Sequence, residues 1–294
     1  MAKKITKRRN KLSNLFESGV FVLLLICALI SIVALALVFI FLLGNSIPFF
    51  TSVDAWSFLT GKVWTPFNTP PLYGVLPLLM GTILVTFVGA LIAIPIGIGC
   101  TIYLSEIANP KVKKVLKPTI EVLAGIPSVV YGLFAALVLS NWIVEIFNPV
   151  TRLNALNGAI ILAIMMIPIL VSVAEEAMNS VPGSLREASF ALGANRWETI
   201  RRTIIPSALP GIVAGIVLAI GRAVGETMAV IMATGNATQF TTDILASVRT
   251  MTAALAIDIP ESIVGSQQYY SLFAVGLTLF IITFAINTLS LIHI

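Results

Sequence analysis

The sequence predicts an all-α integral membrane protein with six transmembrane helices, and three observations support this fold class. Hydrophobic residues make up 58% of the 294 positions, charged residues only 11%, and the mean hydropathy is +1.01. A soluble domain carries about 25% charged residues and less than half apolar ones. The apolar residues fall in long runs, and Lys and Arg gather in alternate connections between those runs. The solvent that suits such a chain is a lipid bilayer.

Six apolar runs reach the length of about 20 residues that a spanning helix needs. We expect spans at residues 19–43, 75–104, 119–142, 157–178, 211–234 and 271–292. Four prolines lie inside these spans, where each removes a backbone donor and favours a kink. They are Pro77, Pro95, Pro127 and Pro168.

The first apolar run follows a basic segment, MAKKITKRRNK, so a cleaved signal peptide is the alternative to a spanning helix. The apolar core of a signal peptide is about 7–15 residues long. This run continues to Leu43, and we therefore expect an uncleaved first transmembrane helix after a basic segment at residues 1–18.

The distribution of basic residues predicts the orientation of the chain. The N-terminal segment carries six Lys and Arg, and the second and fourth connections carry four each, whereas every other connection carries one. Because cytoplasmic loops hold the excess of Lys and Arg, both termini should be cytoplasmic. Residues 44–74 and 235–270 are then external loops, and residues 75–292 form a five-helix core. The positive charge follows this topology, so we expect no nucleic-acid partner.

Residues that carry chemistry are scarce. Cys27 and Cys100 lie in apolar runs and should be small buried hydrophobes. The single histidine is His293, and Gly61-Lys62 lacks the rest of a phosphate-binding loop. We expect no catalytic residue, metal site or cofactor, and any nucleotide that powers the protein should bind another chain.

The connection at residues 181–210 is too patterned for a plain linker. Ser184 stands three residues before Glu187, and Asn195 three before Glu198. Each pair fits a helix start that is capped by its own side chains. Gly193 lies between them, where a left-handed residue ends a helix. We expect two short helices that meet at this glycine, either as an amphipathic hairpin on the membrane surface or as a docking element.

Glu187-Ala188-Ser189, followed by Gly193 and Ile205-Pro206, resembles the EAA loop of ABC-importer permeases. The family pattern is Glu-Ala-Ala, three residues, Gly, nine residues, Ile, one residue, Leu-Pro. The spacing matches, with Ser189, Thr203 and Ile205 as mild departures. The resemblance implies that this loop is the coupling helix that inserts into the ATPase subunit. Its contact residues would be Glu187, Ala188, Ser189, Gly193 and Pro206.

Three longer stretches, at residues 121–134, 191–216 and 221–236, resemble phosphate-importer permeases of the PstC type. The resemblance implies a type I permease fold in a bacterial or archaeal inner membrane and a role in ATP-driven import of inorganic phosphate. It also implies a PstA-like second permease subunit, two ATPase subunits and a phosphate-binding protein as partners. The alternatives are a permease for sulfate or molybdate, a secondary anion transporter that works without ATPase, and a membrane receptor or scaffold.

Within the fifth run, GRAVGETMAV places Arg222 and Glu226 in apolar surroundings. Arg222 is eleven residues beyond Gly211, or about 17 Å at 1.5 Å per residue, near the middle of a core about 30 Å thick. A charge there costs about 2.5–3.5 kcal/mol. We expect Glu226, one helical turn further, to pair with Arg222 when the route is empty. In this hypothesis Arg222 contacts the translocating phosphate through its donors, or gates its route. The alternative is a purely structural ion pair.

Other polar residues in the spans are weaker candidates for the path. Ser128 and Thr227 could line it, as could Thr82, Thr86 and Tyr131, although such hydroxyls commonly bond to helix backbone. Gly221 and Gly225 form a G-x-x-x-G pattern that lets another helix approach closely. In the last external loop, residues 244–257 predict a short helix. This helix either receives the binding protein or packs as a lid over the chain's own helices.

Overall fold

The computed structural model describes the backbone of residues 2–292 and the side chains of residues 18–288. Within this part, six helical segments are long and apolar enough to cross a membrane, which confirms the predicted number. They are Ser18–Phe50, Leu76–Ile107, Ser128–Phe147, Ala155–Asn179, Arg196–Val224 and Gln267–Thr288. The side chains of the basic segment at residues 3–11, and His293, lie outside the described residues.

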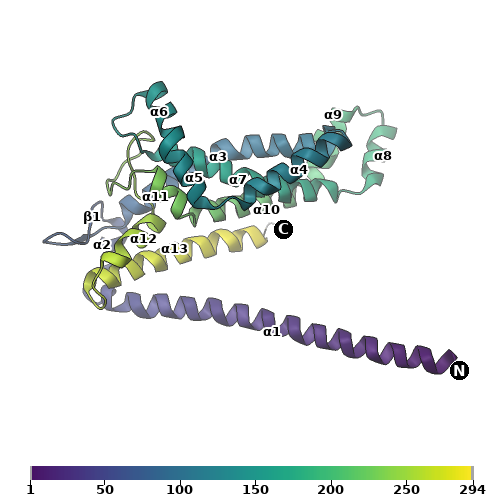
Figure 1. Cartoon of the computed structure of the whole chain (residues 1–294), viewed down its shortest axis with the longest axis horizontal. Helices are drawn as coiled ribbons and strands as arrows, with labels where there is room; N and C mark the ends of the chain where they lie inside the picture. The colour runs from purple at the N-terminus through teal and green to yellow at the C-terminus, as the bar shows by residue number, and fades with distance from the viewer. Residues whose placement is uncertain (1, 293–294) are drawn as a thin grey trace.

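Helix α7 (Ala155–Asn179) is the centre of the bundle, and α3 (Leu76–Ile102) and α10 (Ile205–Val224) pack on either side of it (Figure 1). Glycines allow α3 and α10 to approach α7 closely. A Cβ on Gly97 would lie 2.6 Å from the Leu170 side chain, and one on Gly211 would lie 2.4 Å from that of Ala177. The main buried cluster is therefore formed mostly by residues of these three helices, many of them small or branched.

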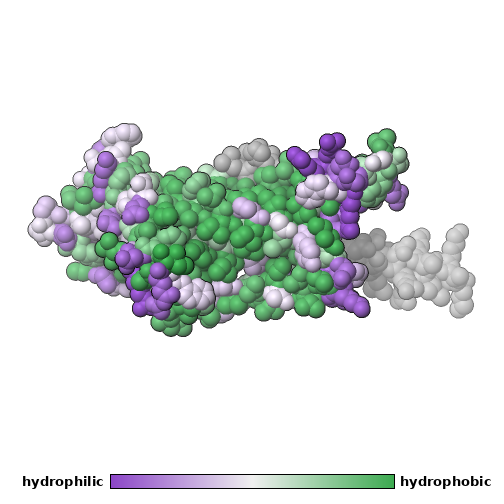
Figure 2. Space-filling model, turned by 90° about the horizontal axis from the view of Figure 1, so that it is seen from above, coloured by the Kyte–Doolittle hydropathy of each residue, from purple (hydrophilic) through white to green (hydrophobic). Residues whose placement is uncertain are grey.

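Helix α1 (Ala2–Phe50) contacts mainly α13 (Gln267–Ile292) and diverges from the bundle toward its own N-terminus (Figure 1). Large apolar side chains from Val20 to Leu43 are exposed around α1. A helix that is apolar all round belongs in a membrane or a core. Figure 2 shows an apolar band across the middle of the molecule with hydrophilic residues gathered at both ends, as a bilayer requires.

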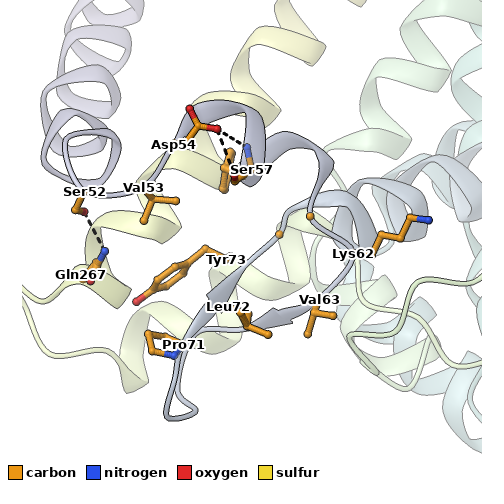
Figure 3. A pocket seen from close by; sticks show the side chains of 13 residues that line it. Ser52, Val53, Asp54, Ser57, Lys62, Val63, Pro71, Leu72, Tyr73 and Gln267 are labelled. Atoms are coloured by element: carbon orange, nitrogen blue, oxygen red, sulfur yellow. Dashed lines mark hydrogen bonds between the residues drawn. The ribbon is translucent and has the colours of Figure 1, made fainter.

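The first span continues seven residues past the predicted end at Leu43, and the next segment is also ordered. It contains α2 (Ala55–Thr60) and the antiparallel pair β1 (Trp64–Thr65) and β2 (Leu72–Tyr73). Residues of α2, of β2 and of the loops beside them line a pocket of about 580 Å³. Figure 3 shows that Asp54 caps α2 through Ser57 and that Gln267 of α13 donates to Ser52. Side chains that line the pocket therefore form hydrogen bonds within this segment, and the bond from Gln267 attaches the segment to α13.

The third span is broken, whereas the sequence predicted a helix over residues 119–142. Helix α4 (Pro110–Gly125) ends before Pro127, and α5 (Ser128–Phe134) begins after it. A π-helical turn, η2 (Ala135–Leu139), then leads into α6 (Ser140–Phe147). A residue before proline avoids the helical region, and Ile126 is accordingly extended, with ψ 130°. The Tyr131 hydroxyl donates to the Leu123 carbonyl at 2.8 Å and so joins the two sides of the break.

The predicted helix at residues 244–257 begins later, as α12 (Met251–Glu261), with Thr250 as its N-cap. It packs on α13 and α3 and buries Met251, Ala253 and Ala254. Of the two predicted roles, the structure therefore supports the lid over the chain's own helices. The lid is anchored by an ion pair in which Arg249 Nη1 lies 3.0 Å from Asp258 Oδ1.

Candidate translocation path and coupling loop

The fifth span breaks where the sequence predicted one helix over residues 211–234. Helix α10 ends at Val224, Gly225 is its C-cap, and α11 (Met228–Ala233) begins three residues later. The backbone groups freed by the break find partners. The Glu226 carboxylate accepts from the Ala229 amide at 3.3 Å, and Thr252 donates to the Glu226 carbonyl at 2.7 Å. The break is therefore a built feature of the fold.

Arg222 lies in the last turn of α10 with an exposed side chain. Among the residues whose side chains are described, it forms no ion pair, so the predicted pair with Glu226 is absent. The physical reason is the break at Gly225, because Glu226 is no longer one helical turn further on the same face. Its carboxylate turns instead to the N-terminus of α11.

The predicted depth of Arg222 agrees with the packing of α10. Gly215 lies against Leu170 and Val173 of α7, about one turn inside the charged end that Glu175 marks. Arg222 is seven residues further, or about 10 Å. Nearby, a Cβ on Gly221 would lie 3.1 Å from Asn287 Oδ1 of α13, so this glycine allows α13 to approach. The exposed guanidinium therefore lies inside the apolar band.

A second break lies beside the first. Helices α5 and α11 pack together, and a Cβ on Gly132 would come within 3.1 Å of the Ala229 Cα and 2.9 Å of the Met232 sulfur. Ser128 is the first residue of α5, and Thr227 immediately precedes α11. Both helices continue away from the loop at residues 181–210 (Figure 1). The two hydroxyl candidates thus lie at the starts of neighbouring half-helices, and Thr227 follows the helix end that carries Arg222.

Thr227 and the weaker candidates Thr82 and Thr86 line different cavities. Thr227 lines a groove of about 580 Å³ together with Gly225, Thr252 and apolar residues of α1 and α13. Thr82 and Thr86 line an almost wholly apolar pocket of about 480 Å³ between α3, α10 and α13. Thr82 donates to the Leu78 carbonyl and accepts from the Met251 amide, both at 2.9 Å. Thr82 therefore fastens the α12 lid to α3.

The loop at residues 181–210 contains α8 (Gly183–Ala191) and α9 (Arg196–Thr199). Gly193 has φ +84°, and Asn195 and Glu198 form a capping box, which confirms the glycine turn and the second helix start. The first predicted start is wrong. The N-cap of α8 is Pro182, without a side-chain cap, because its extended backbone begins the helix before Ser184 can cap it.

The second short helix is also not separate from the fifth span, which was predicted to begin at Gly211. Helix α9, the π-helical turn η3 (Ile200–Ile204) and α10 form one continuous segment, Arg196–Val224. Pro206 lies in the first turn of α10. A proline cannot donate a helical backbone bond, and the irregular π-helical turn η3 directly precedes this position.

The exposed face of this loop is unusually apolar for the polar end of a membrane protein. Leu185, Phe190, Leu192 and Trp197 are exposed, Leu192 by 90%. Glu187 is exposed on the same loop. A groove of about 550 Å³ lies there, and Ala188, Ser189 and Gly193 help to line it. Ser189 Oγ and Thr199 Oγ1 lie 2.9 Å apart and join α8 to α9. Contiguous exposed apolar side chains with a polar rim mark an interaction site.

Comparison with known proteins agrees with this arrangement. Residues 93–293 match the family model described as binding-protein-dependent transport system inner membrane component. A probable ABC transporter permease protein, YqgH of Bacillus subtilis, is 39% identical, and the alignment covers 88% of this chain and 84% of YqgH. The phosphate transport system permease protein PstC of Mesorhizobium japonicum is 36% identical, with 80% and 77% covered.

Two solved structures share the fold. An alginate ABC transporter has a TM-score of 0.61 at 16% identity, covering 91% of this chain and 92% of that chain. The MetNI methionine ABC transporter has a TM-score of 0.53 at 20% identity, covering 75% and 94%. The chain belongs to the family of binding-protein-dependent transport system inner membrane components, as a multi-pass ABC permease of the PstC type in the cell membrane.

Proposed function

We propose that the chain is the permease subunit of an ATP-driven importer of inorganic phosphate and forms part of the translocation path. The observation that carries the proposal is the exposed guanidinium of Arg222 deep inside the apolar band, beside two helix breaks. The PstC proteins to which the chain is similar are named as phosphate permeases, which supports the choice of substrate.

The chemistry of the break suits a transient contact with an oxyanion. A guanidinium is always charged, and its planar fork of donors matches two phosphate oxygens. Ser128 and Thr227 add hydroxyl donors at neighbouring half-helix starts. In our proposal Glu226 shapes the site by capping α11, and a carboxylate near the path also weakens anion binding and so favours release.

The proposal gives the loop at residues 181–210 the task of coupling. Glu187, Ala188, Ser189, Gly193 and Pro206 would dock on an ATPase subunit on the cytoplasmic side, with Leu192 and Trp197 filling apolar hollows there. The partners would be a PstA-like permease, two ATPase subunits that hydrolyse the ATP, and a phosphate-binding protein on the external side. Similarity to a PstA relative over about half of this chain is consistent with a pseudo-symmetric pair of permeases.

The second candidate is import of another oxyanion such as sulfate or molybdate, since one arginine does not select the ion. Proteoliposomes containing the four kinds of subunit should be given radiolabelled phosphate and radiolabelled sulfate, with and without ATP. We expect ATP-dependent uptake of phosphate alone. ATP-dependent uptake of sulfate without phosphate would overturn the substrate, and uptake that ignores ATP would make the protein a secondary transporter.

A further inference from the structure

Helix α4 is weakly attached to the rest of the chain. It spans Pro110–Gly125, and none of its side chains is buried within this chain. Its main contacts are with α7 and with the π-helical turn η1 (Tyr103–Ile107). Since little apolar area holds α4 in place, its position must depend on a few polar contacts. One of these, the bond from the Tyr131 hydroxyl to the Leu123 carbonyl, ties the C-terminal end of α4 to α5.

The N-terminal half of α4 is held by a clamp on Glu175 of α7. Lys113 Nζ lies 2.8 Å from one carboxylate oxygen of Glu175, and Lys117 Nζ lies 3.1 Å from the other. The Glu175 side chain is 1% exposed, whereas the lysines are 34% and 46% exposed. A buried carboxylate is stable only with such partners. Lys113 and Lys117 are four residues apart, so they form one face of α4.

Glu175 is also linked by hydrogen bonds to the coupling loop. Asn179 Nδ2 donates to Glu175 Oε1 at 3.2 Å, and Ser105 Oγ donates to Asn179 Oδ1 at 3.2 Å. The Glu106 carboxylate lies 3.1 Å from the same hydroxyl and competes with Asn179 for its single proton. Polar groups therefore connect α4, through the end of α7, to the π-helical turn η1.

The last link joins η1 to α8. Arg186 Nη1 lies 2.9 Å from the Glu106 carboxylate, and Arg186 Nη2 donates to the Met178 carbonyl at 3.1 Å. Arg196 of α9 donates to the Glu106 carbonyl. Arg186 immediately precedes Glu187, the residue that we propose to dock on the ATPase subunit. One continuous network thus runs from the docking face to α4.

We propose that Glu175 is a positioning residue that carries movement of the coupling loop to α4 and so to the helix break at Pro127. The inference rests on the proposed function, since it assumes that the loop is moved by an ATPase. A loop displacement moves Arg186, Glu106 and the end of α7 as a unit. The two lysines make α4 follow, and α4 then displaces the start of α5, where Ser128 lies beside the path.

The test measures coupling in the reconstituted four-subunit complex. Phosphate uptake and ATP hydrolysis are recorded together for wild type, Glu175→Gln, Glu175→Asp and Lys114→Met. Glu175→Gln keeps the shape and the bond with Asn179 but removes the charge that holds both lysines. Lys114→Met is the matched control, because Lys114 is an exposed lysine of α4 without an ion pair among the described residues.

We expect Glu175→Gln to assemble and hydrolyse ATP within about twofold of wild type, while phosphate carried per ATP falls by about tenfold or more. Glu175→Asp should recover part of the coupling, and Lys114→Met should match wild type. Wild-type coupling in Glu175→Gln would overturn the proposal. If Glu175→Gln does not assemble, Lys117→Met, which leaves Lys113 to neutralise Glu175, takes its place with the same expected direction.

A spectroscopic experiment distinguishes transmission of movement to α4 from an effect of Glu175 on the stability of the complex alone. Spin labels at Val122→Cys on α4 and Leu91→Cys on α3, both exposed, are introduced after Cys27 and Cys100 are replaced by Ala. The distance between the labels should shift when ATP is trapped with vanadate in wild type and Lys114→Met, but not in Glu175→Gln. A full shift in Glu175→Gln would contradict the proposal. This arm needs no phosphate, so a complex that shifts α4 yet imports no phosphate would contradict only the proposed function.

Discussion

Arg222 is held at the end of α10, at the point where the helix gives way to the short non-helical connection Gly225–Thr227. Its depth and chemistry follow directly from the sequence, because a mid-membrane arginine is costly and is seldom kept without a function. The pairing with Glu226 was wrong because spacing alone assumes a continuous helix. A G-x-x-x-G pattern predicts close packing equally well with or without a break, so the break at Gly225 left no clear signal.

The first residue-scale prediction concerns the donor fork of Arg222. Arg222→Lys keeps the charge but loses the planar fork, and we expect ATP-dependent phosphate uptake to fall by about tenfold. Arg222→Gln loses both, and uptake should fall to the level without ATP. Initial uptake rates in proteoliposomes, normalised to assembled complex, provide the measurement. Full uptake in both variants would remove Arg222 from the path.

The second residue-scale prediction concerns Gly193, whose φ of +84° suits glycine, although no atom lies within 4 Å of the place of a Cβ. Gly193→Ala should therefore destabilise the α8–α9 turn by about 1 kcal/mol through backbone strain alone. We expect weaker retention of the ATPase subunits in pull-down from detergent. Gly183→Ala is the control, since Gly183 has equal space and an ordinary φ. Equal losses in the two variants would show that the turn conformation is irrelevant.

At the scale of elements, short-range signals were sufficient for some features and not for others. The capping box at Asn195 and the glycine turn depend on neighbouring residues, and the sequence predicted both. Pro127 predicted a kink, but the full break between α4 and α5 also depends on the bond from Tyr131 to Leu123. The sequence did not decide whether the helix in the last external loop receives the binding protein or packs as a lid, because this depends on the contacts of α12 with α3 and α13.

The α12 lid yields a prediction on pH. Burial raises the pKa of Asp258, while Arg249 and the Trp64 indole donor oppose this rise. A carboxyl with a raised folded pKa stabilises the fold fully below its unfolded pKa, and this contribution is lost as pH rises through the folded pKa. Removing Arg249 raises the pKa of Asp258 in the folded state further, because its charge no longer opposes the effect of burial. Arg249→Met should therefore destabilise the complex strongly at pH 8, by about 3 kcal/mol, and less at pH 5.

Thermal unfolding of the detergent-purified complex at the two pH values measures this effect. The double variant Arg249→Met/Asp258→Asn is the control, because it has no buried carboxyl at this position and its loss should depend little on pH. An Arg249→Met variant that is destabilised equally at pH 5 and pH 8 would show that Asp258 does not govern the anchoring of α12.

At the scale of the whole molecule, the chain has the loop with α8 and α9 at one end, broken helices in the middle and the α12 lid near the other end (Figure 1). The number of spans was predictable, since each apolar run must cross a hydrocarbon core of known thickness. The network from Arg186 to Lys117 was not, because its members come from four separate segments of the chain. The proposed function must therefore be tested by a measurement that depends on both ends of the protein at once.

The most direct test is phosphate uptake by proteoliposomes that contain the wild-type chain or Glu187→Arg, together with the second permease, the ATPase and the binding protein. Glu187 is exposed on α8, so the substitution reverses a surface charge without disturbing the bundle. We predict ATP-dependent phosphate uptake by wild type, and its loss in Glu187→Arg although the variant inserts normally. Undiminished ATP-dependent uptake in Glu187→Arg would contradict the coupling role of the loop, and absence of phosphate uptake in wild type would contradict the account as a whole.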